Sequence, residues 1–529
     1  MSNRPLDRDN MYFNLNDPTN LIAQDLSELK KGGNSVDAQA RADILETNNK
    51  VDDLEEKISS ELADMVTLVT GTTLAEVQLF FDNVPDNTKI KFPRKTYTFE
   101  NVLIIRNKHN LKIDFSEALF ITNRHGYGLV EYTMCSNIVH FGGDFQGAGN
   151  FYPNTFVDGV LKNEKTTATV GFGMYRNGEA VTTPYNNGYL YNCGIGVLVH
   201  NGCVNVTVEK AVAHGFNYAG ISVGFSGDGD TAGNPINYCL DVTVRDCEVY
   251  GNFDCGIQVK GVKGFWVKNN YIHDNGHPDA TANDSEVNPG YGVTLRSGLY
   301  VAENGIVSEN ICVNNKRKGI DSHGGKDFKI VNNRVRGSFY AAIMVTDFVG
   351  QPLGEYTIEG NEVQDCANGS HLYNEAIHAD GLGTAIIRNN VIKNCGYNPT
   401  HPSTNLRTNT GIFVERGVKY VIGNIIINSG YKSGILVSDV TRVHIENNKI
   451  DTVKTDMPIR IRPNDGYTIP FVTVINNFIK NTDGFGVLVQ QCSKGVCQMN
   501  QITNNKTDGE KIFVNSSPNV TPSNNYFFS

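Results

Sequence analysis

Long apolar runs are absent from this sequence of 529 residues. No segment approaches the ~18 apolar residues of a transmembrane helix, and the stretch Met1–Asn10 lacks the apolar core of a secretory signal. A basic surface is not indicated either, because the net charge is −10. We therefore expect a soluble protein that enters no Sec-type pathway, inserts into no membrane and binds no nucleic acid, whose phosphates an acidic surface would repel.

Cysteine pairs at metal-binding spacing are also absent, although the sequence has 11 cysteines. No Cys-x-x-Cys occurs, so the usual signature of a zinc or redox site is missing. Cys247, Cys312, Cys366 and Cys395 fall at core or corner positions of the repeat described next, where small thiols pack well. We expect free, buried thiols in a protein matured in the cytoplasm, with no metal and no cofactor.

The clearest signal that is present is a repeated asparagine. A strand pattern, apolar-x-x-Asn-x-apolar, recurs every 23 to 40 residues. Its asparagines are Asn270, Asn310, Asn333, Asn361, Asn390, Asn424, Asn448, Asn477 and Asn500. Such a period is typical of a solenoid. Asparagine tolerates the left-handed conformation of a corner, and stacked amides can hydrogen-bond at ~4.8 Å per coil. We interpret these residues as scaffold.

A second motif, a small residue followed by apolar-x-apolar, recurs in step with the first. It begins at Gly220, Gly256, Gly292, Ala342, Gly411, Gly434 and Gly486. Each repeat therefore holds two or three short strands separated by Gly or Asn turns, with no helical stretch long enough for a crossover. The sequence predicts an all-β fold, a parallel β-helix.

Residues before the repeat differ from it. Residues 1–35 are polar and turn-rich, and residues 36–72 carry a heptad-like pattern among many charges. The seam residues are Ile44, Val51, Ile58 and Met65, with Leu54 and Leu68 between them. This pattern predicts a short coiled-coil neck compatible with a trimer. The alternative is a single surface helix on the body.

An amphipathic pattern from Leu74 to Phe81 precedes the first strand run. A β-helix must cover its open apolar end, so we assign residues 73–490 to the β-helix with an N-terminal cap. Residues 491–529 are predicted to form the last coil and a C-terminal cap.

The cap and the following segment Lys91-Phe-Pro-Arg-Lys-Thr-Tyr97 resemble the entry of the pectate-lyase-type right-handed parallel β-helix of bacteriophage tailspikes and capsule depolymerases. The Gly-Ile and Asn-Asn coils continue this likeness to about residue 500. The resemblance implies a homotrimer in the phage virion, attached to a tail or baseplate protein through residues 1–35. It also implies assembly in the host cytoplasm and action on a bacterial surface polysaccharide.

Strand alternation predicts which side chains leave the core of each Gly-Ile-x-Val-x strand. One external column is Ser222, Gln258, Thr294, Asp321, Met344, His378, Phe413, Leu436 and Arg460. The other is Gly224, Lys260, Arg296, His323, Thr346, Asp380, Glu415, Ser438 and Arg462. Acids and histidines concentrate on the central coils, with cations towards both ends. This stripe could bind a long polysaccharide, and the alternative is a surface ion-pair ladder.

Hydrolysis of a glycosidic bond needs two carboxyl groups, and their separation sets the stereochemical outcome. Asp380 and Glu415 lie on successive coils, close to the ~5–5.5 Å of retaining enzymes. Asp321 and Asp380 are two steps apart, roughly 9.6 Å, which would suit inversion. His323 or His378 could orient a carboxylate, and Glu375 and Arg416 could bind substrate.

Two other functions remain open. A lyase acting on a uronate would use Lys260 or Arg296 to neutralise the carboxylate and His323 or His378 to remove a proton. A non-catalytic adhesin would only recognise sugar with the same stripe, and a purely structural fibre would use it for subunit contacts. The acids of the central coils favour an endo-acting glycoside hydrolase.

Aromatic residues and long coils add candidates for sugar binding. Trp266, the sole tryptophan, and Tyr420 are predicted to face outward and could stack on a sugar ring, or be covered by a neighbouring subunit. Excursions at 224–238, 276–290 and 397–407 could border a groove. Asp228 and Asp230 in one excursion indicate a solvated turn more than a calcium site.

Overall fold

The structure is a computed structural model that describes most of the chain after residue 65. The described residues are 66–123, 128–149, 194–216, 218–224, 238–276, 290–296, 301–347, 354–368, 374–396, 409–430, 432–455, 457–482, 485–504 and 512–528, with the short strands Asn154–Val157, Val160–Asn163, Tyr175–Arg176 and Glu179–Ala180. The predicted attachment segment 1–35 and nearly all of the predicted neck lie outside them. No helix among these residues is long and apolar enough to cross a membrane.

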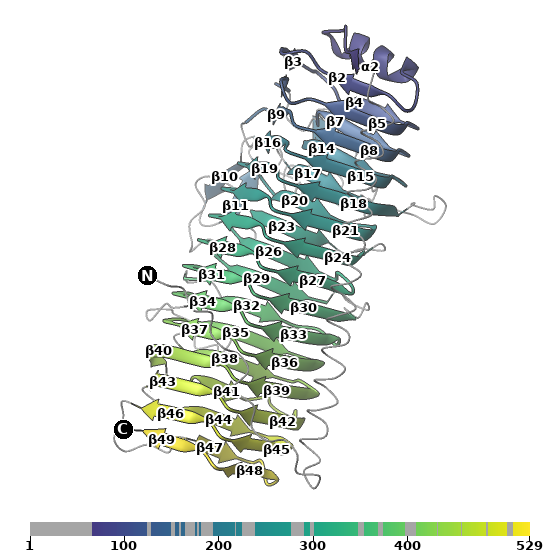
Figure 1. The fold of residues 1–529 in the computed structure, drawn as a ribbon. Coiled ribbons are helices and arrows are strands. Elements are labelled where there is room, and N and C mark those ends of the chain that lie inside the picture. Colours follow the sequence, from purple (N-terminus) through teal and green to yellow (C-terminus); the bar gives the residue numbers. More distant parts are fainter. Residues whose placement is uncertain are drawn as a thin grey trace, which may run out of the picture. The chain divides into compact units, whose positions relative to one another are not determined.

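Three parallel sheets make up the body, and their strands stack rung on rung (Figure 1). We name them sheet A with 16 strands, sheet B with 15 and sheet C with 14. Each turn visits C, A and B in order, as in β20 (Cys255–Val259), β21 (Val262–Lys268) and β22 (Tyr271–His273), before β23 (Tyr291–Arg296) pairs with β20. This confirms the predicted right-handed parallel β-helix.

Sheet C carries the residues that matter below. Its strands are β4 (Leu103–Arg106), β7 (Val130–Thr133), β14 (Ile195–His200), β17 (Ala219–Val223), β20, β23, β26 (Lys318–His323), β29 (Ala341–Thr346), β32 (Glu375–Ala379), β35 (Thr410–Glu415), β38 (Ser433–Ser438), β41 (Ile459–Ile461), β44 (Val487–Gln490) and β47 (Ile512–Asn515). One continuous hydrophobic core runs between the three sheets, from Val69 to Val520.

The small residue of the Gly-Ile motif is explained by the width of the core. A Cβ added at Gly256 would lie 2.4 Å from Ile272 Cγ2, and one added at Gly319 would lie 2.2 Å from Val335 Cγ1. These glycines therefore face the inward residues of sheet B. The residue before the glycine turns outward, because Lys318 Nζ donates a hydrogen bond to the outward-facing Asp321 at 2.7 Å. Sheet C thus has a third outward column, which simple alternation does not predict.

The asparagine ladder is confirmed. Asn270 Nδ2 donates to Asn310 Oδ1 at 2.9 Å, and the same bond repeats at every rung as far as Asn525. The prediction that these asparagines adopt the left-handed conformation is wrong. That conformation falls on the preceding residue, as at Asn269 with φ 54° and Asn389 with φ 57°. The corner needs two residues, one to reverse the backbone and one to satisfy its buried polar groups.

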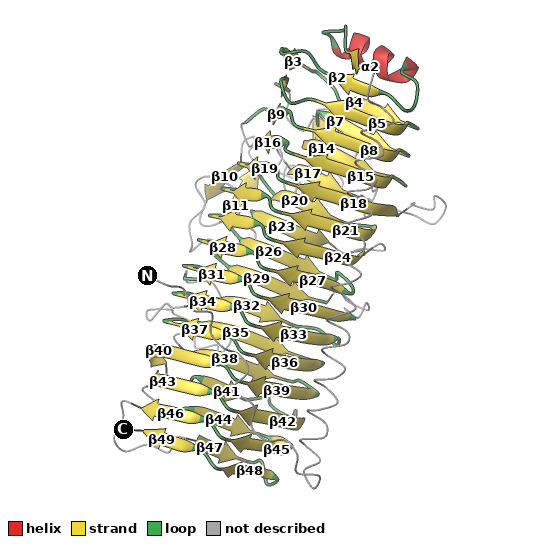
Figure 2. Ribbon diagram, in the orientation of Figure 1, coloured by secondary structure: helices red, strands yellow, loops and turns green. Residues whose placement is uncertain are grey.

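Two ends of the body test the predicted boundaries. Helix α2 (Leu74–Asn83), the one helix in the described part of the chain (Figure 2), begins with a capping box of Thr73 and Glu76 and buries Val77 and Phe81 on the first coil. It forms the predicted cap. β1 (Val66–Leu68) pairs with β2 (Lys89–Lys91) in sheet A, so the helical neck predicted to include Leu68 is wrong for β1.

The C-terminal residues continue the solenoid. β45 (Cys492–Gln498) and β48 (Val520–Ser523) extend sheet A, and β46 (Gln501–Asn504) and β49 (Tyr526–Phe528) extend sheet B. The segment 491–529, predicted as one last coil and a cap, therefore adds strands to all three sheets as far as residue 528.

The described cysteines are free and buried, as predicted. Cys366 and Cys395 occupy a corner, where the Cys366 amide donates to Cys395 Sγ at 3.3 Å. Cys312 lies in the core, and burial raises its pKa to about 12. These thiols pack the interior of the solenoid.

Candidate functional site

The predicted columns on sheet C exist. The register pairs Ser222, Gln258, Thr294, Asp321, Met344, His378, Phe413, Leu436 and Arg460 rung by rung. In the second column Arg296 pairs with His323 and His323 with Thr346. Residues far apart in sequence are therefore neighbours on one face, which we call the outer face of sheet C.

The outer face is more enclosed than the sequence suggests. Asp321 is 0% exposed, His378 3%, Glu415 7% and Asp380 9%. These side chains alternate with core residues such as Ile320 and so point away from the core, yet little of their surface reaches solvent. The expectation of a solvent-exposed stripe is wrong at these positions. Strand alternation predicts the direction of a side chain but not whether neighbouring groups shield it from solvent.

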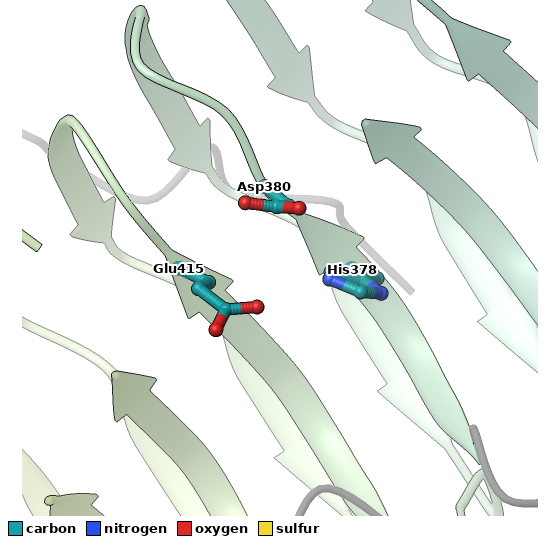
Figure 3. A group of neighbouring side chains, drawn as sticks. All are labelled: His378, Asp380 and Glu415. Carbon is teal, nitrogen blue, oxygen red and sulfur yellow. The ribbon is translucent and has the colours of Figure 1, made fainter. Parts of the chain in front are cut away.

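Four residues form what we call the central cluster: His378, Asp380, Glu415 and Arg416. Figure 3 shows the first three, with His378 and Asp380 from the end of β32 and Glu415 from the end of β35. One nitrogen or oxygen of each of these three residues lies within 4.8 Å of the others. Two carboxyl groups and an imidazole thus share one small, nearly buried volume.

Arg416 fixes the charge of the central cluster. Its Nε and Nη2 donate to Asp380 Oδ1 and Oδ2, both at 2.6 Å, and Nη2 also reaches Asp347 Oδ1 at 2.6 Å. Hydrogen bonding to Asp380, with Asp347 nearby, raises the pKa of Arg416 above its usual range. The bidentate geometry is that of an arginine with an ionised carboxylate. Arg416 itself has a left-handed backbone, φ 54°, which directs its side chain back over the ends of β32 and β35.

The same three groups could act as metal ligands, because imidazole nitrogen and carboxylate oxygen are common donors. Against that use, both oxygens of Asp380 already accept hydrogen bonds from Arg416. The guanidinium supplies the positive charge that a cation would otherwise bring. The donor set therefore fits an acid–base site better than a metal site.

Asp321 belongs to a second group, two rungs away on the same face. Lys318 Nζ donates to its Oδ1 at 2.7 Å, and His323 Nε2 lies 3.0 Å from its Oδ2. Burial acts to raise the pKa of Asp321, but His323 and Lys318 outweigh burial and hold the pKa well below its usual range. Thr346 Oγ1 lies 2.9 Å from His323 Nδ1. Asp321 is therefore a fixed anion, fully buried, that positions His323.

Arg296 belongs to a third group at the next rungs. It forms an ion pair with the buried Asp254, and its Nη1 donates to the Tyr218 hydroxyl at 3.2 Å. That hydroxyl donates to Gln258 Oε1 at 2.7 Å, and Gln258 Nε2 donates to Ser222 Oγ at 3.2 Å. Burial raises the pKa of Asp254 in spite of Arg296. The chain of hydrogen bonds runs along the outer face.

The structure does not bring all predicted residues together. Lys260, directly after β20, and Glu375, the first residue of β32, are buried, 4% and 0% exposed. Trp266 and Tyr420 lie on the outer column of sheet A, where Trp266 pairs with Thr243 and Tyr420 with His444, as their predicted phase requires. They face away from the central cluster, on a different side of the solenoid. The excursions 224–238, 276–290 and 397–407, with Asp228 and Asp230, lie almost wholly outside the described residues.

Several charged residues of this face were not found from the sequence. Lys318 and Asp254 precede the motif glycines, in or beside the third column. Asp347 directly follows Thr346, the last residue of β29 and its member of the second column. The buried pair Glu131 and His200, with Oε1 and Nε2 3.0 Å apart, continues both columns towards the N-terminus. Extending the two columns by two coils towards the N-terminus would have found that pair. Lys318 and Asp254 could not be found in this way, because their direction depends on the inward-pointing glycine that follows them.

The outer face can therefore perform acid–base chemistry at one point and bind charged groups along its length. Asp380, Glu415 and His378 are residues of the types that serve as a base, a nucleophile or a proton donor. The side chains that reach solvent beside these groups are those of His323, 41% exposed, and Arg416, 38% exposed.

Comparison with known proteins agrees with the fold. A family described as right handed beta helix region matches residues 194–353 and 349–528. No curated protein matches the sequence significantly.

Solved structures with a similar fold include two tailspike proteins and an epimerase. The Dettilon tailspike protein is 14% identical, with a TM-score of 0.39, and the match covers 85% of this chain and 68% of that one. The tailspike protein gp49 from Pseudomonas phage LKA1 is 11% identical, with a TM-score of 0.43, covering 79% and 75%. The A-module of the mannuronan C-5 epimerase AlgE4 from Azotobacter vinelandii is 12% identical, with a TM-score of 0.42, covering 85% and 95%. These likenesses are too distant to carry an argument about a reaction.

Proposed function

This chain belongs to the right-handed β-helix family, and we propose that it is a phage tailspike enzyme that binds and depolymerises a bacterial surface polysaccharide, a capsule or an O-antigen. The reaction we propose is endo-acting glycoside hydrolysis. One observation carries the proposal: Asp380, Glu415 and His378 lie within 4.8 Å of one another on adjacent rungs of one face. A hydrolase needs such a pair of carboxyl groups.

The roles of the two carboxyl groups follow from their surroundings. Arg416 holds Asp380 through two hydrogen bonds, so Asp380 is the ionised partner that attacks the sugar or activates water. Two carboxyl groups this close favour a single shared proton, which leaves Glu415 as the proton donor to the leaving oxygen. His378 orients one of these groups or the substrate. Asp347 holds Arg416 from its other side.

The separation of the pair predicts the stereochemical outcome. Oxygens of Asp380 and Glu415 within 4.8 Å match the ~5–5.5 Å of retaining enzymes better than the ~6.5–9.5 Å of inverting ones. The alternative pair of Asp321 and Asp380 is less suitable, because Asp321 is 0% exposed and lies between Lys318 and His323. We therefore expect retention of configuration.

A lyase is the second candidate, favoured by the partly exposed Arg416 and His323 at the edge of the buried groups. In that reaction an arginine would neutralise a uronate carboxylate, and a histidine would remove the α-proton. The two reactions differ in their products, because β-elimination leaves an unsaturated sugar that absorbs in the ultraviolet and hydrolysis does not.

The test is mass analysis of oligosaccharides released from a panel of bacterial capsules and O-antigens by the full-length protein. We expect one polysaccharide to be cut to oligomers of its repeat unit, each carrying the mass of one added water. Asp380→Asn and Glu415→Gln should each lower the rate by about 100-fold or more, the usual contribution of an acid–base group. Both variants should keep the thermal unfolding midpoint of the wild type within a few degrees.

The matched control is Glu359→Gln at the end of β30 (Glu355–Glu359) in sheet A, where Glu359 accepts from Arg388 Nη2 at 2.9 Å. It makes the same chemical change in another carboxylate–arginine pair and should leave the rate unchanged. Products lacking the added water would show a lyase. Binding without any fall in polysaccharide mass would show an adhesin, and either result would refute hydrolysis.

A further inference from the structure

The outer face of sheet C carries an aromatic and cationic group two rungs from the central cluster that the proposed reaction does not use. We call it the arginine clamp, and it consists of Arg317, Tyr291 and Tyr340, with Lys318 beside them. Tyr291 begins β23, Lys318 begins β26, and Tyr340 immediately precedes β29. The clamp therefore spans three consecutive rungs.

Arg317 is held firmly at this position. Its amide donates to Gly290 O at 2.8 Å, and its carbonyl accepts from the Tyr340 amide at 2.8 Å, so its backbone is part of the stack. The guanidinium carbon lies 5.3 Å from the Tyr291 ring centroid and 5.6 Å from that of Tyr340. Two tyrosine rings thus fix the side chain by cation–π contact.

Among the described residues, no carboxylate forms an ion pair with Arg317, although its charge acts to lower the pKa of the nearby Asp254, which is itself paired with Arg296. The cations around it are paired: Arg296 with Asp254 and Lys318 with Asp321. In the described part of the chain, none of the ion pairs includes Arg317, and its Nε is buried without a hydrogen-bond partner. Half-buried guanidinium groups normally pair with an anion, since leaving such a donor unsatisfied costs about 1–3 kcal/mol.

Three cations and the carboxylates of Asp254 and Asp321 gather around Tyr291. Three cationic groups, those of Arg296, Arg317 and Lys318, lie within 5.7 Å of the Tyr291 ring centroid. Burial lowers the pKa of Lys318, and the charge of Arg317 lowers it further. A negative group that reached the guanidinium of Arg317 would give an ion-pair partner to the one cation of these three that has none within the described residues.

We propose that the arginine clamp is a specificity subsite for a carboxylate group on the polysaccharide, such as that of a uronic acid or a pyruvate ketal. Arginine binds a planar carboxylate through two parallel hydrogen bonds, and tyrosine rings present apolar surface to a sugar ring. The clamp and the central cluster lie on one face, and Lys318 and His378 are separated by two rungs, ~9.6 Å along the axis. This inference rests on the proposed function for its polysaccharide ligand, and it selects acidic substrates over neutral ones.

The test measures binding separately from cleavage. Full-length protein carrying Glu415→Gln, chosen because it should cleave the polymer slowly, is applied to an array of acidic and neutral bacterial polysaccharides. The tightest binder is then compared with the same polymer after chemical reduction of its carboxylates. We expect an acidic polysaccharide to bind best and reduction to weaken binding about 10-fold or more.

The variants assign that loss to one side chain. Arg317→Gln should bind the native polymer as weakly as the parent protein binds the reduced one, and it should no longer distinguish the two polymers. Arg317→Lys keeps the positive charge but loses the paired donors, so its affinity for the native polymer should lie between those of the parent protein and Arg317→Gln. The control is Arg334→Gln on sheet B, where a side chain 73% exposed lies 3.9 Å from Glu362 and should be neutral.

Three outcomes overturn the inference: a neutral polysaccharide binding best, equal binding of native and reduced polymer, or unchanged selectivity in Arg317→Gln. If Arg317→Gln does not fold, the comparison of native and reduced polymer on the parent protein decides. Carboxylate-dependent binding through Arg317 without cleavage would refute the proposed enzyme but not the subsite. Cleavage by the wild type, together with unaltered binding in Arg317→Gln, would refute the subsite but not the proposed enzyme.

Discussion

Single side chains hold the corners of each coil, and Asn390 shows how. It is fully buried, and its Oδ1 accepts from the amide of Asn361 at 3.0 Å and from Asn361 Nδ2 at 2.9 Å. Its own Nδ2 donates to Asn424 Oδ1 and to Ile358 O, at 2.9 Å each. One amide therefore satisfies polar groups on three rungs, in a place that water does not reach.

Asn390→Ala should destabilise the solenoid by about 3 kcal/mol, because it leaves buried donors and acceptors unsatisfied at ~1–3 kcal/mol each. Chemical unfolding followed by circular dichroism measures the change. The matched control is Asn389→Gly at the left-handed neighbour, φ 57°, where Gly360 and Gly423 occupy the equivalent positions of adjacent coils. It should change stability by less than about 1 kcal/mol. Equal effects of the two variants would contradict the division of roles at the corner.

Lys419 is a residue whose charge costs stability. It is the second residue of β36 (Val418–Ile422), and its side chain is buried. Its Nζ donates to Gly381 O at 2.9 Å and to Gly383 O at 3.1 Å, in the turn after Asp380. Burial lowers its pKa from 10.5 to about 7, while Asp380 acts to raise it. Between these two pH values the unfolded chain binds a proton that the folded chain does not, so this residue makes stability rise with pH.

The pH dependence is isolated by comparison with Lys419→Met, which loses the two hydrogen bonds at every pH but cannot titrate. The unfolding free energy of the wild type relative to this variant should rise by about 2 kcal/mol between pH 7.5 and pH 9.5, following ~1.4 kcal/mol per pH unit. Below the folded-state pKa both states are protonated and the difference should be flat. Urea titrations at several pH values measure it, and a difference that is constant or falls with pH would show that Lys419 stays charged.

At the scale of strands, the sequence predicts register better than environment. The repeated Gly-Ile-x-Val phase was enough to place Asp321, His378 and Glu415 correctly, because a slip of one residue would bury the polar side chains in the core. It was not enough to find Lys318, which faces outward only because the following Gly319 points inward against Val335. This change in the direction of the side chains depends on the width of the core, which no single strand encodes.

The strand pattern also does not predict how far the outward-facing side chains are shielded from solvent. Alternation shows that Asp380 points away from the core, but its 9% exposure and its bonds to Arg416 depend on segments distant in sequence. The heptad pattern erred for a related reason. Leu68 fits the predicted helical seam, yet β1 pairs with β2 in sheet A, where Leu68 lies opposite Lys91. Tertiary pairing outweighs local periodicity at such a boundary.

On the scale of the whole molecule, all parts of the proposed site come from consecutive coils of one chain. The central cluster, the Asp321 group and the arginine clamp all come from sheet C of a single chain, between β23 and β35. In a solenoid each coil contacts mainly its neighbours, so we expect the geometry of these three groups to be independent of the residues before the cap. We propose that residues 1–65, which precede this body in the sequence, serve assembly and attachment instead.

Deleting residues 1–65 should therefore leave a folded, active enzyme with a changed oligomeric state. The first strand, the cap α2 and all three sheets lie within Val66–Ser529, so the β-sheet circular dichroism spectrum should persist and the unfolding midpoint should move by only a few degrees. If the heptad residues before Val66 hold a trimer, sedimentation should show a trimer for the full chain and a monomer for the shortened one. Both should release the same oligosaccharides at similar rates per chain. A shortened protein that stays trimeric would place the subunit contact on the β-helix, and one that is folded but inactive would place part of the active site between subunits.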